Sequence, residues 1–181
     1  MNPAPSAGSS DTSTMSAPDG RKASFAPVIA PHTRVLVLGS LPGEASLLER
    51  RYYAHPTNAF WRLMGEVVGE DLRALEYADR LQALLRHRVG LWDVVAEARR
   101  QGSSDGAIRD MQKNNLAELT ARLPNLRALG FNGGKSWTVG SRQFAADSGV
   151  ALIGLPSSSA AYAGMPYSEK LKAWMALRAF L

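Results

Sequence analysis

One short segment gathers the side chains best suited to chemistry. Residues 52–61 read Tyr-Tyr-Ala-His-Pro-Thr-Asn-Ala-Phe-Trp, which places aromatic rings, an imidazole and an amide on one proline-containing loop. Such a loop can stack a planar ring and hydrogen-bond its edge. Tyr53, His55 and Asn58 are therefore candidate binding or catalytic residues. The alternatives are a core aromatic, a structural histidine, and a cap for the helix that begins near Phe60.

A single carboxylate interrupts an apolar stretch farther along the chain. Residues 90–95 read Gly-Leu-Trp-Asp-Val-Val. Burying Asp93 without a partner costs free energy, so we expect it to be hydrogen-bonded, ion-paired or turned toward a pocket. A carboxylate that faces a pocket can orient a water molecule or stabilise positive charge. Asp93 is our first catalytic candidate, and turn or helix-capping chemistry is the alternative.

A glycine-containing turn offers backbone donors. Residues 39–43 read Gly-Ser-Leu-Pro-Gly, a tight turn between a strand and a helix. Its glycines permit close approach of a ligand to the backbone. The amide groups of Ser40 and Leu41 are candidates for stabilising an anion. A simple end to the strand is an equal alternative.

Three consecutive hydroxyl groups follow another apolar run. Ser157, Ser158 and Ser159 come directly after it, and their hydroxyl and backbone amide groups suit contacts with phosphate. Lys135 and Arg142 are candidate partners for the same phosphates. An ordinary surface loop is the alternative interpretation.

Short apolar runs alternate with longer segments of helical period, which is typical of βαβ units. The predicted strands are residues 35–38, 89–95, 126–131 and 150–155. The predicted helices are residues 58–68, 79–86, 114–123, 134–146 and 168–181. We therefore expect a three-layer α/β/α fold with a four-stranded, mainly parallel central sheet. Because ligands collect at the carboxyl ends of such strands, the segments described above should form one site.

The composition limits the class of protein. The chain has 181 residues, 45% of them apolar, a formal net charge of +5 and no cysteine. No apolar run reaches the roughly 18 residues of a membrane helix, and disulfides are excluded. We predict a disordered Pro-, Ser- and Ala-rich tail over residues 1–31 and one domain over residues 32–181. A cytoplasmic location is expected, with nucleoid association in a bacterium.

The order and spacing of the four segments resemble the uracil-DNA glycosylase superfamily. The nearest branches are the mismatch-specific, Mug-like uracil-DNA glycosylases and the deoxyinosine-DNA glycosylases. The resemblance runs from about Arg34 to the C-terminus and is strongest over residues 53–61. It implies an enzyme that flips a damaged base out of the duplex and hydrolyses its N-glycosidic bond without a metal or cofactor. Tyr53 takes the position of the stacking aromatic.

Two positions depart from the pattern of this superfamily. Leu41 stands where Mug-like relatives carry the asparagine that positions water, and Leu155 stands where relatives carry histidine or asparagine. The catalytic role of the missing polar side chains is then expected to fall to Asp93 first and to Asn58 second. The resemblance does not identify the side chain that fills the space left by the flipped base.

The resulting prediction is a monofunctional glycosylase that acts as a monomer on double-stranded DNA containing a deaminated base. Uracil opposite guanine is the first expected substrate, and hypoxanthine is the main alternative. Lyase activity is not expected, because Lys135 is the only lysine in the matched segments and fits a phosphate contact. A non-catalytic DNA- or nucleotide-binding module on the same fold is the alternative function.

Other hydrolases fit the sequence poorly. A serine hydrolase would need a nucleophile elbow and a partnered histidine, which the serine run lacks. The three histidines, His32, His55 and His87, are too far apart in the sequence to suggest a metal centre.

Overall fold

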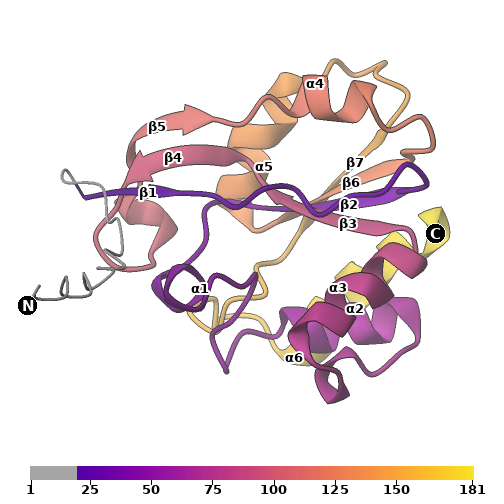
Figure 1. Ribbon diagram of the computed structural model, residues 1–181, viewed down its shortest axis with the longest axis horizontal. Helices are drawn as coiled ribbons and strands as arrows, with labels where there is room; N and C mark the ends of the chain where they lie inside the picture. The colour runs from indigo at the N-terminus through magenta and orange to yellow at the C-terminus, as the bar shows by residue number, and fades with distance from the viewer. Residues whose placement is uncertain (1–19) are drawn as a thin grey trace, which may run out of the picture.

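The central sheet has the predicted strands. The structure is a computed structural model and describes residues 20–181 (Figure 1). Four parallel strands pair in the order β3-β2-β6-β7. Their bounds are β2 Val35–Gly39, β3 Val89–Asp93, β6 Ala128–Asn132 and β7 Ala151–Leu155. The predicted three-layer α/β/α architecture is confirmed.

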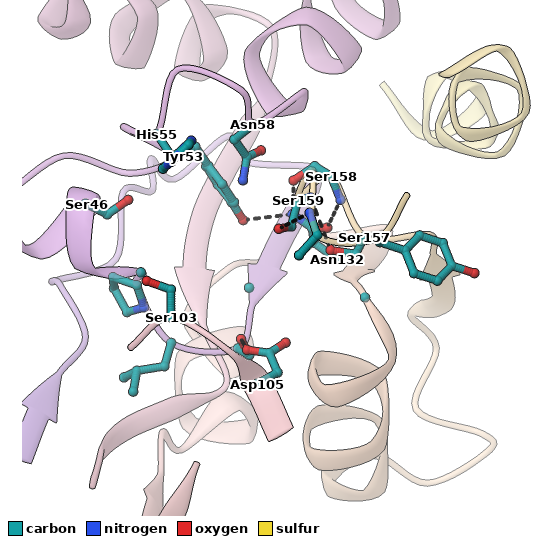
Figure 2. A pocket seen from close by; sticks show the side chains of 18 of the residues that line it. Ser46, Tyr53, His55, Asn58, Ser103, Asp105, Asn132, Ser157, Ser158 and Ser159 are labelled. Carbon is teal, nitrogen blue, oxygen red and sulfur yellow. Dashed lines mark hydrogen bonds between the residues drawn. The ribbon is translucent and has the colours of Figure 1, made fainter. Parts of the chain in front are cut away.

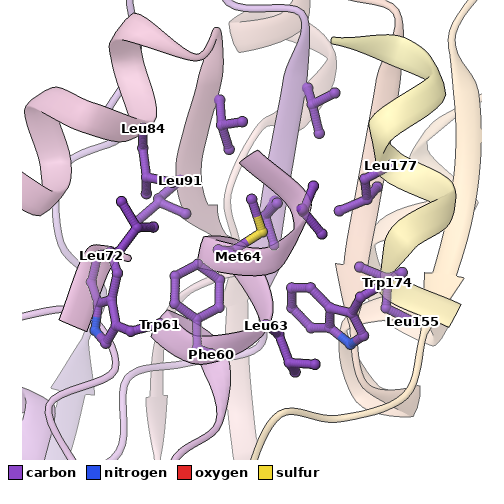
Figure 3. Close-up of a cluster of buried hydrophobic side chains, with 14 of the residues drawn as sticks. Phe60, Trp61, Leu63, Met64, Leu72, Leu84, Leu91, Leu155, Trp174 and Leu177 are labelled. Atoms are coloured by element: carbon purple, nitrogen blue, oxygen red, sulfur yellow. The ribbon is translucent and has the colours of Figure 1, made fainter. Parts of the chain in front are cut away.

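Strand β2 is buried on both of its faces, so it is apolar at every position. Its valines, Val35 and Val37, pack into a first core cluster, and Leu36 and Leu38 pack into a second. The first cluster lies under α2, α3 and α6, and Figure 3 shows its large rings, those of Phe60 and Trp174 among them. The second cluster lies under α4 and α5 on the opposite face (Figure 1).

The helices are mostly shorter than predicted, because several end in turns of 3-10 helix. Their bounds are α1 Glu44–Glu49, α2 Phe60–Val68, α3 Tyr77–Arg86, α4 Leu116–Ala121, α5 Gly134–Gly140 and α6 Tyr167–Trp174. The 3-10 helices are η1 Leu72–Ala74, η2 Asp105–Ala107, η3 Ser141–Gln143 and η4 Met175–Phe180. None of the helices within residues 20–181 has the length and apolarity needed to cross a membrane.

A second, antiparallel sheet was not predicted. Its strands pair in the order β1-β4-β5 and comprise β1 Arg21–Ala23, β4 Val95–Arg99 and β5 Arg109–Lys113. The predicted strand 89–95 is therefore two strands, because the chain leaves the central sheet after Asp93 and enters β4 at Val95. Strand β5 reads Arg-Asp-Met-Gln-Lys and is exposed at every residue, so it lacks apolar alternation.

The prediction of a disordered tail is wrong for residues 20–31. The ring of Phe25 packs edge-on against Tyr52 with centroids 5.1 Å apart, and its carbonyl accepts a hydrogen bond of 3.0 Å from Trp92 Nε1. Val28 forms a bridge with Leu91 at the edge of the central sheet. Phe25, Val28 and Ile29 stand among Ser, Ala and Pro and are too few to form a periodic pattern. Residues 1–19 lie outside the described residues, so the prediction there stays a prediction.

We predict that Phe25→Ala destabilises the protein by about 2 kcal/mol, because it removes a partly buried ring from the first core cluster. Urea unfolding at neutral pH measures this difference. The matched control is Leu48→Ala, which should change stability by less than about 0.5 kcal/mol because Leu48 is 87% exposed. Equal stabilities of the two variants would contradict the packing role of Phe25.

Candidate active site

The carboxyl ends of the four parallel strands open into a cleft of about 750 Å³ (Figure 2). Its walls come from the turn after β2, the loop before α2, the β4–β5 hairpin, the start of α5 and the loop after β7. All the predicted site residues except Arg142 line this cleft. Arg142 lies exposed in η3, beyond the end of α5, so it does not share the cleft with Lys135.

The ring of Tyr53 is held firmly at one wall. It stacks on Phe60 with centroids 3.8 Å apart and planes 12° from parallel. Its hydroxyl oxygen accepts a hydrogen bond of 3.3 Å from Asn132 Nδ2, and burial raises the pKa of the phenol. The backbone of Tyr53 has φ 53°, a left-handed conformation that turns the loop at this residue. Phe60 covers one face of the ring, and the residue lines the cleft.

Asn132 joins three segments around the cleft. Its Nδ2 also donates to Ser158 Oγ over 2.9 Å, and its Oδ1 accepts from Ser158 N–H over 2.9 Å. The carbonyl of Ser158 in turn accepts from Ala59 N–H over 2.9 Å. The end of β6, the loop after β7 and the loop before α2 are therefore one connected unit, as the dashed lines around Asn132 in Figure 2 indicate.

The Asn58 side chain both lines the cleft and bonds the start of α2. Its Oδ1 accepts a hydrogen bond of 3.0 Å from Phe60 N–H at the start of α2. This bond fixes which end of the amide is the acceptor and leaves Nδ2 as a donor without a partner among the described residues. Figure 2 shows the Asn58 side chain at the cleft beside Tyr53. The bond to Phe60 N–H therefore fixes the amide at the start of α2 and leaves its donor at the cleft.

Asp93 is a buried carboxyl group at the end of β3. It is 3% exposed, and its Oδ2 has no hydrogen-bond partner among the described residues. Burial raises the pKa of Asp93 to about 7, with an opposing effect from Arg100 and a smaller reinforcing one from Asp105. Gly39 lies against it, because a Cβ at position 39 would stand 2.6 Å from Asp93 Oδ1. Of the three arrangements expected from the sequence, the one observed is the carboxyl group at a pocket, because Asp93 lines the cleft.

Asp105 is a cleft residue that the sequence analysis missed. It stands at the start of η2 in the β4–β5 hairpin, and its Oδ1 accepts a hydrogen bond of 2.5 Å from Ser40 Oγ. In the same hairpin, Ser103 Oγ accepts from Glu44 N–H over 2.9 Å. These contacts join positions about 60 residues apart in sequence, and no local pattern signals them.

The turn after β2 is held by a buried arginine. Arg100 is 4% exposed and donates hydrogen bonds to the carbonyls of Leu41, Pro42 and Gly102. The Leu41 side chain packs in the second core cluster, so only its backbone can serve a ligand. The N–H groups of Ser40 and Leu41 make no hydrogen bond to any described residue and remain available as donors at the cleft.

Comparisons with known proteins agree with this geometry. The sequence profile of the Uracil DNA glycosylase superfamily matches residues 26–178. A protein from Methanosarcina barkeri named Hypoxanthine DNA glycosylase is 47% identical over 116 residues, which are 64% of this chain and 73% of that protein. A protein of the same name from Methanosarcina acetivorans is 41% identical over 115 residues, with the same coverage.

The fold has a solved counterpart as well. The solution NMR structure of a candidate uracil DNA glycosylase from Methanosarcina acetivorans superposes with a TM-score of 0.78 at 35% identity. The similarity covers 87% of this chain and 96% of that structure. Together with the profile match and the cleft at the strand ends, these similarities show that the chain belongs to the uracil DNA glycosylase superfamily and is a DNA glycosylase, a hydrolase of N-glycosyl bonds.

Proposed function

We propose that this protein flips deaminated bases out of double-stranded DNA and excises them, with hypoxanthine and uracil as its substrates. The observation that carries the proposal is the donor end of Asn58, fixed by its bond to Phe60 N–H next to the Tyr53 ring. Deamination replaces the exocyclic amino donor of adenine or cytosine with a carbonyl acceptor. A fixed donor forms a hydrogen bond with the carbonyl of a deaminated base but has no acceptor when it faces the amino group of a normal base. The site should therefore discriminate strongly against normal bases.

The two substrates have different support. Two relatives of this chain are named Hypoxanthine DNA glycosylase, which supports hypoxanthine as the first proposed substrate. Uracil opposite guanine was the first expectation from the sequence, and it stays a proposal. Both bases are planar and carry a carbonyl where the normal base carries an amino group, so Tyr53 and Asn58 can receive either one.

The residues of the cleft suggest how the bond is cleaved. Water attacks the sugar C1′ while the bond from C1′ to the base nitrogen breaks, and the bonding electron pair leaves with the base. The proton that the water loses ends on the released base. The transition state therefore carries positive charge on the sugar and negative charge on the base. The ionised form of Asp93 would orient the water and offset the positive charge. The free N–H groups of Ser40 and Leu41 would stabilise the departing base.

Contacts with the DNA backbone are assigned to the loop after β7 and the start of α5. Ser157, Ser159 and Lys135 line the same cleft as Tyr53 and offer hydroxyl and ammonium donors for phosphates. Ser158 is engaged with Asn132 and holds the loop in place. Arg142 could contact only DNA that extends beyond the cleft.

The substrates are tested with duplex oligonucleotides that carry one hypoxanthine opposite thymine or one uracil opposite guanine. We expect abasic sites on both duplexes, faster for hypoxanthine, with strand cleavage only after alkali. Duplexes with adenine or cytosine at the same position serve as controls and should remain intact. Abasic sites on neither modified duplex, with DNA binding preserved, would contradict the proposed substrates and favour the non-catalytic alternative.

We predict that Asn58→Asp slows base excision at least about 100-fold in single-turnover assays, because the donor becomes an acceptor. The carboxylate can still accept from Phe60 N–H, so the start of α2 should be retained. Asn58→Ala loses both the donor and the acceptor of the Phe60 N–H bond, and we expect it also to destabilise the protein by about 1 kcal/mol. Full activity of Asn58→Asp would remove Asn58 from base recognition.

We predict that excision by the wild-type protein rises with pH and levels off above about pH 7, because the ionised form of Asp93 performs the proposed role. Asp93→Asn should lose this pH dependence together with at least about 100-fold of the rate. Single-turnover rates from pH 5 to pH 9 measure both effects. A rate that falls above pH 7 would instead make Asp93 a proton donor.

Asp93→Asn should also stabilise the folded protein. The unfolded chain ionises Asp93 near pH 4, whereas the folded protein keeps the proton up to about pH 7. Stability is therefore lost as pH rises between these values. Asp93→Asn should gain about 2 to 3 kcal/mol more stability over wild type at pH 8 than at pH 5, as measured by urea unfolding. Equal gains at both pH values would show that the carboxyl group ionises normally.

A further inference from the structure

A second cavity adjoins the loop that carries Tyr53 and Asn58. Its volume is about 450 Å³, and the loop of residues 52–58 is a wall that it shares with the active-site cleft, because Tyr53, His55 and Asn58 line both spaces. Its other wall comes from the segment that links η1 to α3 and from the first turn of α3. None of the roles proposed above uses this cavity.

Three guanidinium groups line the second cavity. They belong to Arg51, just before the shared loop, and to Arg73 and Arg80 on the other wall. Two of them lie over aromatic rings, with Arg51 Cζ 5.4 Å from the centroid of Tyr77 and Arg80 Cζ 5.4 Å from that of Trp61. Because a ring face attracts a cation without carrying a net charge, these contacts hold the guanidinium groups and leave their charge in place.

Arg80 is held by hydrogen bonds as well. This half-buried side chain donates from Nε to the carbonyl of Leu75 over 2.9 Å and from Nη2 to the carbonyl of Arg73 over 3.2 Å. Its Nη1 makes no hydrogen bond to a described residue, and no carboxylate among residues 20–181 forms an ion pair with it. A fixed cation with a donor to spare suits an anionic ligand.

The carboxylates nearby balance this charge only in part. Glu49 and Glu76 also line the cavity, so three guanidinium groups stand against two carboxylates. The ion pair between Glu49 and Arg51 spans 4.0 Å, and Arg73 is 3.8 Å from Asp71, which does not line the cavity. Such long and exposed pairs contribute little, so both arginines can bind a stronger partner.

A phosphate group suits these donors. Guanidinium groups bind phosphate oxygens with paired hydrogen bonds, and a tetrahedral phosphate offers several oxygens to donors that approach from different directions. The cavity has room for a phosphate with its attached sugar, since ligand pockets in proteins begin at about 300 Å³. It also adjoins the cleft assigned to the flipped base, where a bound DNA strand carries one phosphate for each nucleotide.

We propose that the second cavity is a phosphate-binding site formed by Arg51, Arg73 and Arg80. The phosphate belongs either to the DNA strand that enters the cleft or to a free phosphate monoester, and both sources present the same kind of oxygen to the guanidinium groups. The inference goes beyond the proposed function, because binding of phosphate in this cavity requires no excision of a base.

The first test measures how the affinity for DNA depends on salt. The probe is a duplex with one tetrahydrofuran, a stable abasic analogue that offers no base to excise. Loss of one phosphate contact lowers the slope of log K against log salt concentration by about 0.9. Arg73→Gln and Arg80→Gln should each show this loss if the DNA supplies the phosphate. Arg73 makes no hydrogen bond to the backbone with its side chain, so Arg73→Gln should leave the fold intact.

Arg86→Gln is the matched control for the charge change. Arg86 also belongs to the region of α3 but lies outside the second cavity. Its side chain is 60% exposed and is paired with one carboxylate, as is the side chain of Arg73. The slope for Arg86→Gln should equal that of the wild-type protein.

The second test titrates inorganic phosphate at constant ionic strength and follows the Nε–H signals of the arginines by NMR. The signals of Arg51, Arg73 and Arg80 should shift and reach saturation, while that of Arg86 should not move. Arg80→Gln should weaken this binding about 10-fold, the size expected for one hydrogen bond to a charged group.

Together the two tests identify the source of the phosphate. A greater loss of slope in Arg73→Gln and Arg80→Gln than in Arg86→Gln would assign the cavity to the DNA backbone. Saturable phosphate binding that weakens in Arg80→Gln, with slopes no different from that of Arg86→Gln, would assign it to a free phosphate monoester. Neither result would overturn the inference, since both observations would then be missing. Failure of the proposed substrates would not be mistaken for this failure, because neither test requires excision.

Discussion

The cleft depends on one carboxyl group that the fold buries without a hydrogen-bond partner on Oδ2. A buried, unpaired polar group costs free energy, so its surroundings must leave it room and yet keep it in place. Gly39 supplies the room, since any side chain there would overlap Asp93 Oδ1 and crowd the Tyr53 hydroxyl. The nearby cation does not neutralise the carboxyl group by contact, because Arg100 directs its donors to the carbonyls of Leu41, Pro42 and Gly102.

This arrangement relies on rigid elements on both sides. The central strand β2 is buried between two core clusters, and Gly39 is its last residue, so the backbone next to Asp93 has little freedom to relax. The loops above the strands are tied together by Asn132, while the hairpin is tied to the first turn by the bond between Ser40 and Asp105. The unpaired carboxyl group is therefore surrounded by contacts that do not involve Oδ2.

The sequence was sufficient to predict the central sheet and the meeting of most site residues. Strands buried on both faces are apolar throughout, and the carboxyl ends of parallel strands converge, so Asp93 and the serine run were expected near Tyr53. The antiparallel sheet escaped prediction because β5 is polar and exposed and β1 has only three residues. Asp105 was not predicted as a site residue either, because the β4–β5 hairpin of this sheet brings it to the cleft. Arg142 lies outside the cleft, in η3 beyond the end of α5, so its contact with phosphate stays a prediction.

The two leucines that replace polar groups of related enzymes have a packing explanation. The side chain of Leu41 belongs to the second core cluster, and that of Leu155 belongs to the first, where its Cδ1 would lie 3.1 Å from a Cβ at Gly130. Both side chains therefore contribute apolar volume to the core, and of the two residues only Leu41 lines the cleft. Side-chain donors reach the cleft from loops instead, with Asn58 on the loop before α2 and serines on the loop after β7. Because the loops are joined through Asn132, a change in one would shift the donors on the other, which would couple the proposed base recognition to the proposed contacts with the DNA backbone.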